Sequence, residues 1–231
     1  MLIRPAGPED AEAIADLYTA ARVAAVPQMP PAKHTNAEDR QWMGSRLTDG
    51  DHQAWVAEQD GRIVGYALIT RVWLDHLFVE PDHLDTGIGS ALLDVVKSAR
   101  PDGFCLWVFE SNDGARRFYA RHGLVELEHT DGSGNEEQAP DLRMAWPGAD
   151  PLAFYRGLID EVDEQLGDLL ARRAALTAAV QEHKGAPSRD PQREQEIAAA
   201  LARRAPALGH ERLSRIVQAI ITESIDAATE L

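Results

Sequence analysis

Four cations stand out in the last third of the chain, and one of them lies on a helical pattern where packing alone would favour an apolar residue. The segment LIDEVDEQLGDLLARRAALTAAV, residues 158–180, has apolar residues at alternating steps of three and four, the spacing of a coiled-coil seam. Arg173 occupies one seam position, and Lys184 lies about three helical turns later on the same face. Cations inside a helical bundle are costly unless they are paired, so the pattern predicts a bound anion.

Arg156 and Arg193 extend this pattern. Arg156 points roughly 100° away from Arg173 around the same helix, toward the place where a partner chain would pass. Arg193 opens the next helix together with Asp190 and Glu194. A seam arginine can also pair with a partner's glutamate to fix register, and cations near helix ends are usually solvated. The four cations together favour an anion site over these alternatives.

The motifs RGLIDEVDEQLGDLLARR, DPQRE and ITES closely resemble the all-helical class of chorismate mutases, over residues 152–231. That family converts chorismate to prephenate by a pericyclic rearrangement that needs no cofactor. The resemblance implies that Arg173 and the partner's Arg156 clamp the two carboxylates, each through a planar guanidinium. It implies that Lys184 donates to the ether oxygen and that Glu194 accepts from the ring hydroxyl. The substrate-binding residues that it implies are Arg156, Asp190, Arg193 and Ser224.

One position departs from that family. One turn past Ser224 the family carries Gln or Glu as a second donor to the ether oxygen, and this chain has Ala228. Loss of one such donor can cost on the order of a hundredfold in rate. The alternatives are therefore a slow mutase, an enzyme for aminodeoxychorismate or isochorismate, a ligand-binding domain that regulates its neighbour, or a dimerisation module.

A second chemical signal lies in the N-terminal part, where WLDHLFV (73–79) predicts a strand that runs into EPDHLDTGIGSALLDVVKSA. A glycine-bearing loop follows, and an amphipathic helix begins near Gly89. This order gathers backbone N–H groups and a helix N-terminus around one point, which suits a phosphate group. The same spacing also occurs in an ordinary strand-to-helix turn.

VEPDHLDTGIGSALL and LWVFESNDGARRFYARHGL (106–124) resemble two motifs of the GNAT superfamily of N-acetyltransferases, and the match covers residues 1–147. The resemblance implies that acetyl-CoA is the co-substrate and that the loop amides hold its pyrophosphate. Leu84 and Asp85 depart from the family, and a carboxylate beside a pyrophosphate costs affinity unless it points to solvent. The implied cofactor-binding residues are Phe78, Val79, Leu84, Asp85, Thr86, Gly87, Ile88, Gly89, Ser90 and Asn112.

Acetyl transfer needs a proton donor, a base and an oxyanion donor, because an uncharged amine attacks a thioester. The resemblance implies that Tyr119 lies near the departing sulfur and protonates the thiolate. Asp75 and His76 are the candidate bases, and on a strand only one of them is expected to face the site. The alternative for Tyr119 is a core aromatic, and the alternative for Asn112 is a helix cap.

The sequence divides into two parts, each of which must position its own set of these residues. All five Trp and every Phe and Tyr lie at or before Tyr155, which indicates two cores of different construction. The N-terminal part predicts helices at 8–22 and 36–47 and a hairpin over 53–69. WPGADP (146–151) stops a strand and starts a helix. We therefore expect an α+β domain over residues 1–149, a GNAT fold with a mixed central sheet flanked by helices.

Residues 150–231 are expected to form an all-α domain of three helices. The first spans about 151–184, roughly 50 Å at 1.5 Å per residue. The second begins at Asp190-Pro191, and the third follows Gly209. So long a helix followed by two shorter ones cannot bury its own seam. The pattern therefore predicts an intertwined helical homodimer.

Amino-acid composition limits the ligands, the cellular compartment and the cofactors that the protein is expected to have. A formal charge of −15 argues against nonspecific binding to nucleic acid or anionic membranes. One cysteine, Cys105, suits a reducing cytoplasm, and we expect neither a secretory signal nor a membrane span. The histidines lack metal-ligand spacing, so no metal is expected. The sequence thus predicts a bifunctional cytoplasmic enzyme, a chorismate mutase and an N-acetyltransferase for an unknown amine. The alternative is an acetyltransferase regulated by a catalytically weak helical domain.

Overall fold

The computed structural model describes residues 1–184 and 190–229, apart from the side chains of Lys184 and Thr229. The chain forms two compact units, residues 1–155 and 156–231. Each unit has its own apolar core, and aromatic residues belong only to the cores of the first. This division agrees with the break in aromatic usage along the sequence.

Two antiparallel sheets form the centre of the first unit. One has the order β1-β2-β3-β4, made of Leu2–Pro5, Gln53–Gln59, Arg62–Ile69 and Leu74–Val79. The other has the order β5-β7-β6, made of Phe104–Phe109, Asp141–Trp146 and Val125–Thr130. Among the described residues, one parallel bridge, Trp73↔Cys105, joins the sheets at the start of β4 and β5. Beyond it the two strands are not paired, so the predicted mixed sheet is confirmed and is open at its middle.

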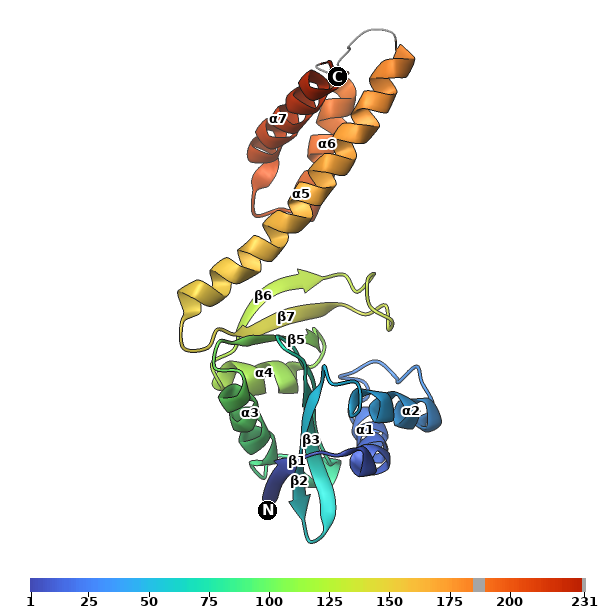
Figure 1. Cartoon of the computed structure of the whole chain (residues 1–231), viewed down its shortest axis with the longest axis vertical. Helices are drawn as coiled ribbons and strands as arrows, with labels where there is room; N and C mark the ends of the chain where they lie inside the picture. The colour runs from blue at the N-terminus through green and yellow to red at the C-terminus, as the bar shows by residue number, and fades with distance from the viewer. Residues whose placement is uncertain (185–189, 230–231) are drawn as a thin grey trace. The chain divides into compact units, whose positions relative to one another are not determined.

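Helices cover both faces of the β1–β4 sheet (Figure 1). The helices α1 (Ala11–Ala24) and α2 (Asn36–Arg46) lie on one face, and α3 (Ile88–Ala99) and α4 (Asp113–Arg121) lie on the other side. Alternation along β3 explains this arrangement, since Tyr66 and Leu68 pack with α1 while Ala67 and Ile69 pack with α3. The sheet is therefore buried on both faces.

The predicted elements of this unit are confirmed with small shifts. The hairpin turns at Asp60 and Gly61, whose φ angles of 52° and 76° are those expected for an Asp-Gly turn. The first helix begins at Ala11 rather than at residue 8, because Pro8–Asp10 form a separate 3-10 turn. A second such turn, Pro81–His83, precedes the glycine loop.

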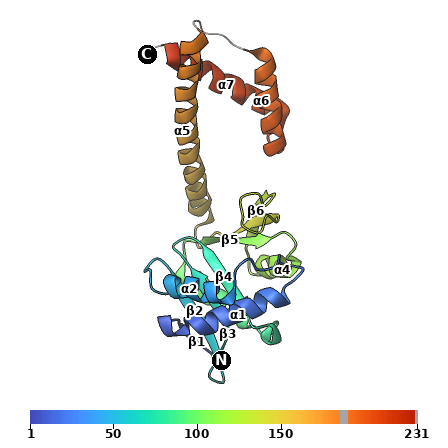
Figure 2. The same ribbon diagram turned by 90° about the vertical axis from the view of Figure 1, so that its right-hand side faces the viewer.

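The second unit is entirely helical in its described part, as predicted. Its helices are α5 (Pro151–Lys184), which begins in the last residues of the first unit, α6 (Pro191–Arg204) and α7 (Gly209–Thr229). Ala198, Val217 and Ile221 form the small core between α6 and α7. Figure 2 shows α7 reaching the C-terminal half of α5, whereas α6 stands apart from α5. None of the described helices combines the length and apolar character that crossing a bilayer requires.

Candidate functional site

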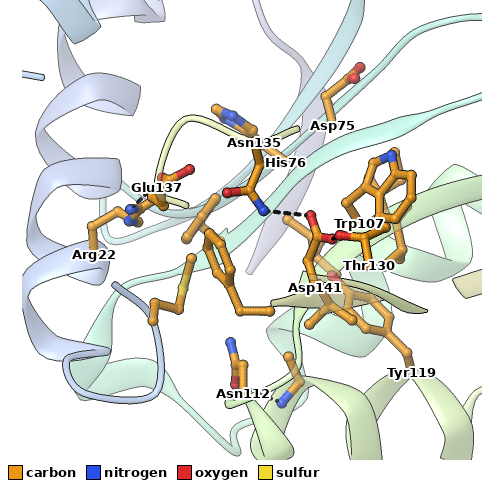
Figure 3. A pocket seen from close by; sticks show the side chains of 18 of the residues that line it. Arg22, Asp75, His76, Trp107, Asn112, Tyr119, Thr130, Asn135, Glu137 and Asp141 are labelled. Carbon is orange, nitrogen blue, oxygen red and sulfur yellow. Dashed lines mark hydrogen bonds and ion pairs between the residues drawn. The ribbon is translucent and has the colours of Figure 1, made fainter. Parts of the chain in front are cut away.

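A cleft of about 840 Å³ opens in the first unit where β4 and β5 separate (Figure 3). Residues 74–78 of β4 line one wall, and residues 106–109 of β5 line the other. Tyr119 and Asn112 of α4 and part of the loop 131–140 complete the lining. Because β4 is not paired with β5 here, its outer backbone edge is available to hydrogen-bond a ligand that enters the cleft.

The predicted phosphate loop leads directly into α3. Gly87 is the N-cap of that helix with φ of 90°, and it offers no side chain to the first-turn N–H groups. Those groups are thus left for a ligand, as a phosphate site requires. Asp85 is exposed with φ of 59°, so its carboxylate is solvated. The loop therefore fits a pyrophosphate despite the acidic residue, and Leu84 beside it is also exposed.

Gly87→Ala should lower the free energy of unfolding by about 1–2 kcal/mol, because an L side chain is strained at this positive φ. The same change should weaken coenzyme A binding by distorting the loop. Gly44→Ala, in the middle of α2 with open space around the added methyl group, is the matched control and should be neutral or stabilising. Denaturant titration of both variants measures this, and a Gly87→Ala protein as stable as the wild type would contradict it.

Tyr119 combines the features of a proton donor. Its side chain lines the cleft, although the residue is only 9% exposed. Burial raises the pKa of Tyr119 above that of a free phenol, so the hydroxyl is protonated at neutral pH. Asn112 also lines the cleft, and its Oδ1 atom accepts from the Ala115 N–H at 3.1 Å. Asn112 is therefore a helix cap that borders the site.

Asp75 and His76 both line the cleft, which follows the edge of β4 rather than one of its faces. His76 Nδ1 lies 2.8 Å from the Tyr66 hydroxyl, and its ring stacks on Tyr18 and Trp42. Burial lowers the pKa of His76 to about 3, so the ring is uncharged and a weak base at neutral pH. Partial withdrawal from water raises the pKa of Asp75 instead. Asp75 is therefore better suited than His76 to accept a proton.

The same burial makes stability depend on pH. Between pH 6.5 and 3 the unfolded chain protonates this histidine and the folded chain does not, so the unfolded state binds more protons. The free energy of unfolding should therefore fall on acidification, by up to about 1.4 kcal/mol per pH unit from this group. His76→Phe should reduce that slope, whereas replacement of the exposed His129 by Gln should preserve it. Unfolding measured at pH 7, 6, 5 and 4 tests this, and parallel slopes in all three proteins would contradict it.

In the second unit, Arg173 and Ser224 lie together although 51 residues separate them. The Arg173 Nη1 group donates to Ser224 Oγ at 2.7 Å and to the Ile220 carbonyl at 3.3 Å. Ser224 is buried and donates to the same carbonyl at 2.6 Å. Both acceptors are uncharged, so these bonds orient the guanidinium without neutralising it.

The other predicted residues of this unit are more dispersed. Arg156 is exposed on α5, seventeen residues before Arg173, which places their Cα atoms about 26 Å apart along the axis. Asp190 caps α6 by accepting from the Arg193 N–H at 3.1 Å, and Arg193 itself is exposed. Glu194 and Ala228 are half-buried, in the first turn of α6 and the last turn of α7. The Lys184 side chain lies outside the described residues.

Several residues of the cleft carry no signal in the sequence. The buried Arg22 of α1 donates to the Glu137 carboxylate at 2.9 Å and to the Tyr18 hydroxyl at 3.2 Å. This ion pair ties the loop 131–140 to α1. Asp141 and Trp107 line the cleft as well. Their roles depend on how this loop folds, and its composition, rich in Gly, Ser and Asn, indicates only a turn.

Two family models match the chain. The model described as Acetyltransferase (GNAT) domain matches residues 50–126, and the model described as Chorismate mutase type II matches residues 155–229. The first match includes the whole phosphate loop and Tyr119, and the second includes Arg156, Arg173 and Ser224.

Two N-acetyltransferases are similar in sequence to the first unit. The chain is 35% identical over 98 residues to the peptidyl-lysine N-acetyltransferase YiaC of Escherichia coli, an alignment that covers 41% of this chain and 64% of YiaC. The chain thus spans less than two thirds of that relative. It is 34% identical over 110 residues to an uncharacterised N-acetyltransferase of Archaeoglobus fulgidus, and this alignment covers 41% of this chain and 72% of the relative.

Solved structures agree on the fold. YjaB of Escherichia coli superimposes with a TM-score of 0.52 at 26% identity, over 64% of this chain and 98% of YjaB. The structure of yncA from Salmonella typhimurium, solved with acetyl-CoA, has a TM-score of 0.53 at 18% identity, over 65% of this chain and 95% of yncA. The chain therefore belongs to the GNAT superfamily of N-acetyltransferases through its first unit and carries a type II chorismate mutase domain in its second.

Proposed function

We propose that the chain is a bifunctional enzyme, an acetyl-CoA-dependent N-acetyltransferase joined near residue 150 to a dimeric chorismate mutase, with domains at 1–149 and 150–231. The cleft between β4 and β5 carries the first assignment, because it combines an open strand edge with a protonated tyrosine, and β4 leads on to the capless N-terminus of α3. Cys105, the one cysteine of the sequence, is buried, which fits a cytoplasmic protein.

In the acetyltransferase, the N–H groups of residues 84–90 would hold the pyrophosphate of acetyl-CoA, while the backbone of Phe78 and Val79 pairs with its pantetheine arm. The amine nitrogen attacks the thioester carbonyl, forming the C–N bond as the C–S bond breaks. Tyr119 gives its proton to the departing thiolate, and Asp75 takes the proton that the amine loses, directly or through water. The binding of acetyl-CoA by yncA, which shares the fold, supports this use of the cleft.

The acceptor is best sought among amines of proteins and small molecules. YiaC is by name a peptidyl-lysine N-acetyltransferase, so lysine side chains are the first class to test. Release of coenzyme A from acetyl-CoA with a panel of peptides and amines measures this activity. No release with any member, together with no binding of coenzyme A, would contradict the assignment.

In the mutase, Arg173 would bind one carboxylate of chorismate. The 26 Å between Arg173 and Arg156 is far longer than such a substrate, so Arg156 of the same chain cannot complete the site. Arg156 of the partner subunit would supply the second clamp, with Lys184 and Glu194 at the reacting ether and the ring hydroxyl. Asp190, Arg193 and Ser224 would complete the pocket.

The apolar seam of α5 supports a dimer. Its six residues are each 47–61% exposed in the single chain, and they are Ile159, Val162, Leu166, Leu169, Leu176 and Val180. An apolar stripe of this length is normally covered by another helix, most simply the same helix of a second copy. Sedimentation of the purified protein tests this, with a monomer at micromolar concentration as the contradicting result.

A regulatory role is the second candidate, favoured by Ala228 at the position of a catalytic donor. In that case chorismate or an aromatic amino acid would bind the helical domain without turnover and would change the rate of acetyl transfer. Calorimetry with chorismate, followed by the acetyltransferase assay with and without it, distinguishes the two roles.

A further inference from the structure

We propose that Asp141 recognises the acceptor of the acetyl group, and that this acceptor is a protonated amine carried on an apolar stem. The inference rests on the proposed acetyltransferase function and adds the recognising residue and the class of substrate. It starts from a carboxylate that is buried in the cleft at the first residue of β7.

Asp141 is 9% exposed, and both side-chain donors on its carboxylate are uncharged. The Thr130 hydroxyl donates to Oδ1, and the Asn135 amide donates to Oδ2 at 3.0 Å (Figure 3). A buried carboxylate without a cation is costly, because its lost hydration is only partly replaced by neutral donors. A cationic ligand in the cleft would supply the missing charge.

The surroundings hold this carboxylate in one orientation. Asn135 is itself fixed at both ends of its amide, since Nδ2 donates to the Ala139 carbonyl at 2.7 Å and Oδ1 accepts from the Ala139 N–H at 3.2 Å. Thr130 Oγ1 also accepts from the Gly132 N–H at 3.0 Å. The loop 131–140 thus forms a rigid support, and a preorganised group binds a ligand with little loss of entropy.

The charges of the cleft favour a cation. Among the described residues, its lining includes the carboxylates of Asp75, Glu137 and Asp141 against the one guanidinium of Arg22. Arg22 is paired with Glu137 and its guanidinium also lies 6.0 Å from the Phe109 ring centre, and His76 is uncharged at neutral pH. The lining is therefore negative overall, which attracts an ammonium group and repels an acidic acceptor.

The strand register places an apolar surface beside Asp141. Phe109 is directly opposite Asp141 across β5 and β7, and Trp107 is two residues before it, so all three lie on one face. Both aromatic residues line the cleft, and Trp107 remains 45% exposed. An ammonium on Asp141 would direct its carbon stem across these rings, where apolar contact and cation–π attraction both contribute.

One cation on that face, Arg143, is directed elsewhere. Arg143 is opposite Trp107 in the register, but its guanidinium lies 4.8 Å from the Trp73 ring centre and 3.7 Å from a Glu128 oxygen. Asp141 is thus the cleft carboxylate that combines burial, fixed orientation and an aromatic neighbour. The class of ligand that fits is a primary amine on an alkyl or arylalkyl stem.

The test is an NMR titration of the full-length chain with phenethylamine and n-butylamine, and with phenylacetate as the acidic counterpart. Asp141→Asn keeps the size and the acceptor oxygen but removes the charge, and Asp94→Asn is the matched change at an exposed carboxylate of α3, outside the cleft lining. We expect Asp141→Asn to weaken amine binding about 10- to 100-fold, the range for a charged hydrogen bond. Asp94→Asn should weaken it less than threefold, and phenylacetate should bind more weakly than either amine.

Coenzyme A binding, measured in parallel, separates failure of the Asp141 proposal from failure of the acetyltransferase assignment. Unchanged coenzyme A affinity in Asp141→Asn with lost amine binding supports the proposal. Equal amine affinity in Asp141→Asn and the wild type overturns it, as does a larger loss in Asp94→Asn or a preference for phenylacetate. Absence of coenzyme A binding in the wild type would instead contradict the acetyltransferase assignment.

A measurement on the wild type tests the proposal even where a variant fails to fold. Amine titration should shift the backbone amide resonances of Thr130, Asn135 and Asp141. Shifts confined to residues outside the cleft would overturn the proposal without any substitution.

Discussion

Arg173→Ala should reduce chorismate conversion roughly a thousandfold. The guanidinium is held toward α7 by Ser224 and Ile220, both uncharged acceptors, and so keeps its charge for a carboxylate. Removing one partner of a buried charge pair costs about 2–5 kcal/mol, which corresponds to several powers of ten in rate. The loss of chorismate absorbance over time measures the rate.

The neighbouring Arg172 provides the matched control. It is exposed on α5, so Arg172→Ala should retain nearly full activity. Arg173→Lys should restore only a small part of the rate, because an ammonium cannot make the two parallel hydrogen bonds of a guanidinium. More than a tenth of wild-type activity in Arg173→Ala would show that this residue does not bind the substrate.

Tyr119→Phe should lower kcat for acetyl transfer by about 10²-fold or more, the usual contribution of a general acid. The change removes one hydroxyl from a buried ring whose raised pKa keeps it protonated at neutral pH. Coenzyme A affinity should change little, because the loop 84–90 is untouched. Single-turnover rates with a responsive amine measure the chemical step directly.

The control for this prediction is Tyr155→Phe, which removes a hydroxyl from the half-buried tyrosine at the end of the first unit. It should leave kcat within twofold. If Tyr119→Phe behaves in the same way, Tyr119 is a core aromatic and another group protonates the thiolate.

Much of the fold follows from local sequence signals. The Asp-Gly hairpin, the aspartates that cap α5 and α6 and the glycine before α3 all lie where their conformational preferences place them. These signals work because each depends on a few neighbouring residues. The mixed sheet and the helical third follow from them and from the resemblance to two families.

The cleft was harder to predict because its walls meet through long-range contacts. The Arg22–Glu137 pair joins residues 115 positions apart, and Asp141 becomes a buried carboxylate only when the loop before it folds over β5. Likewise, the sequence places His76 on a strand but does not show that Tyr66, Tyr18 and Trp42 surround it. That surrounding changes its chemistry from a candidate base to an uncharged core ring.

A bifunctional enzyme requires that one polypeptide combine the acetyltransferase cleft with a working mutase site. The most direct test is a time course of chorismate consumption by the purified wild-type chain, with the product, an isomer of chorismate, identified by its acid-catalysed conversion to phenylpyruvate. We expect catalytic loss of chorismate with prephenate as the product. Chorismate that remains unchanged at stoichiometric protein would contradict it and leave the helical unit as a binding or dimerisation domain.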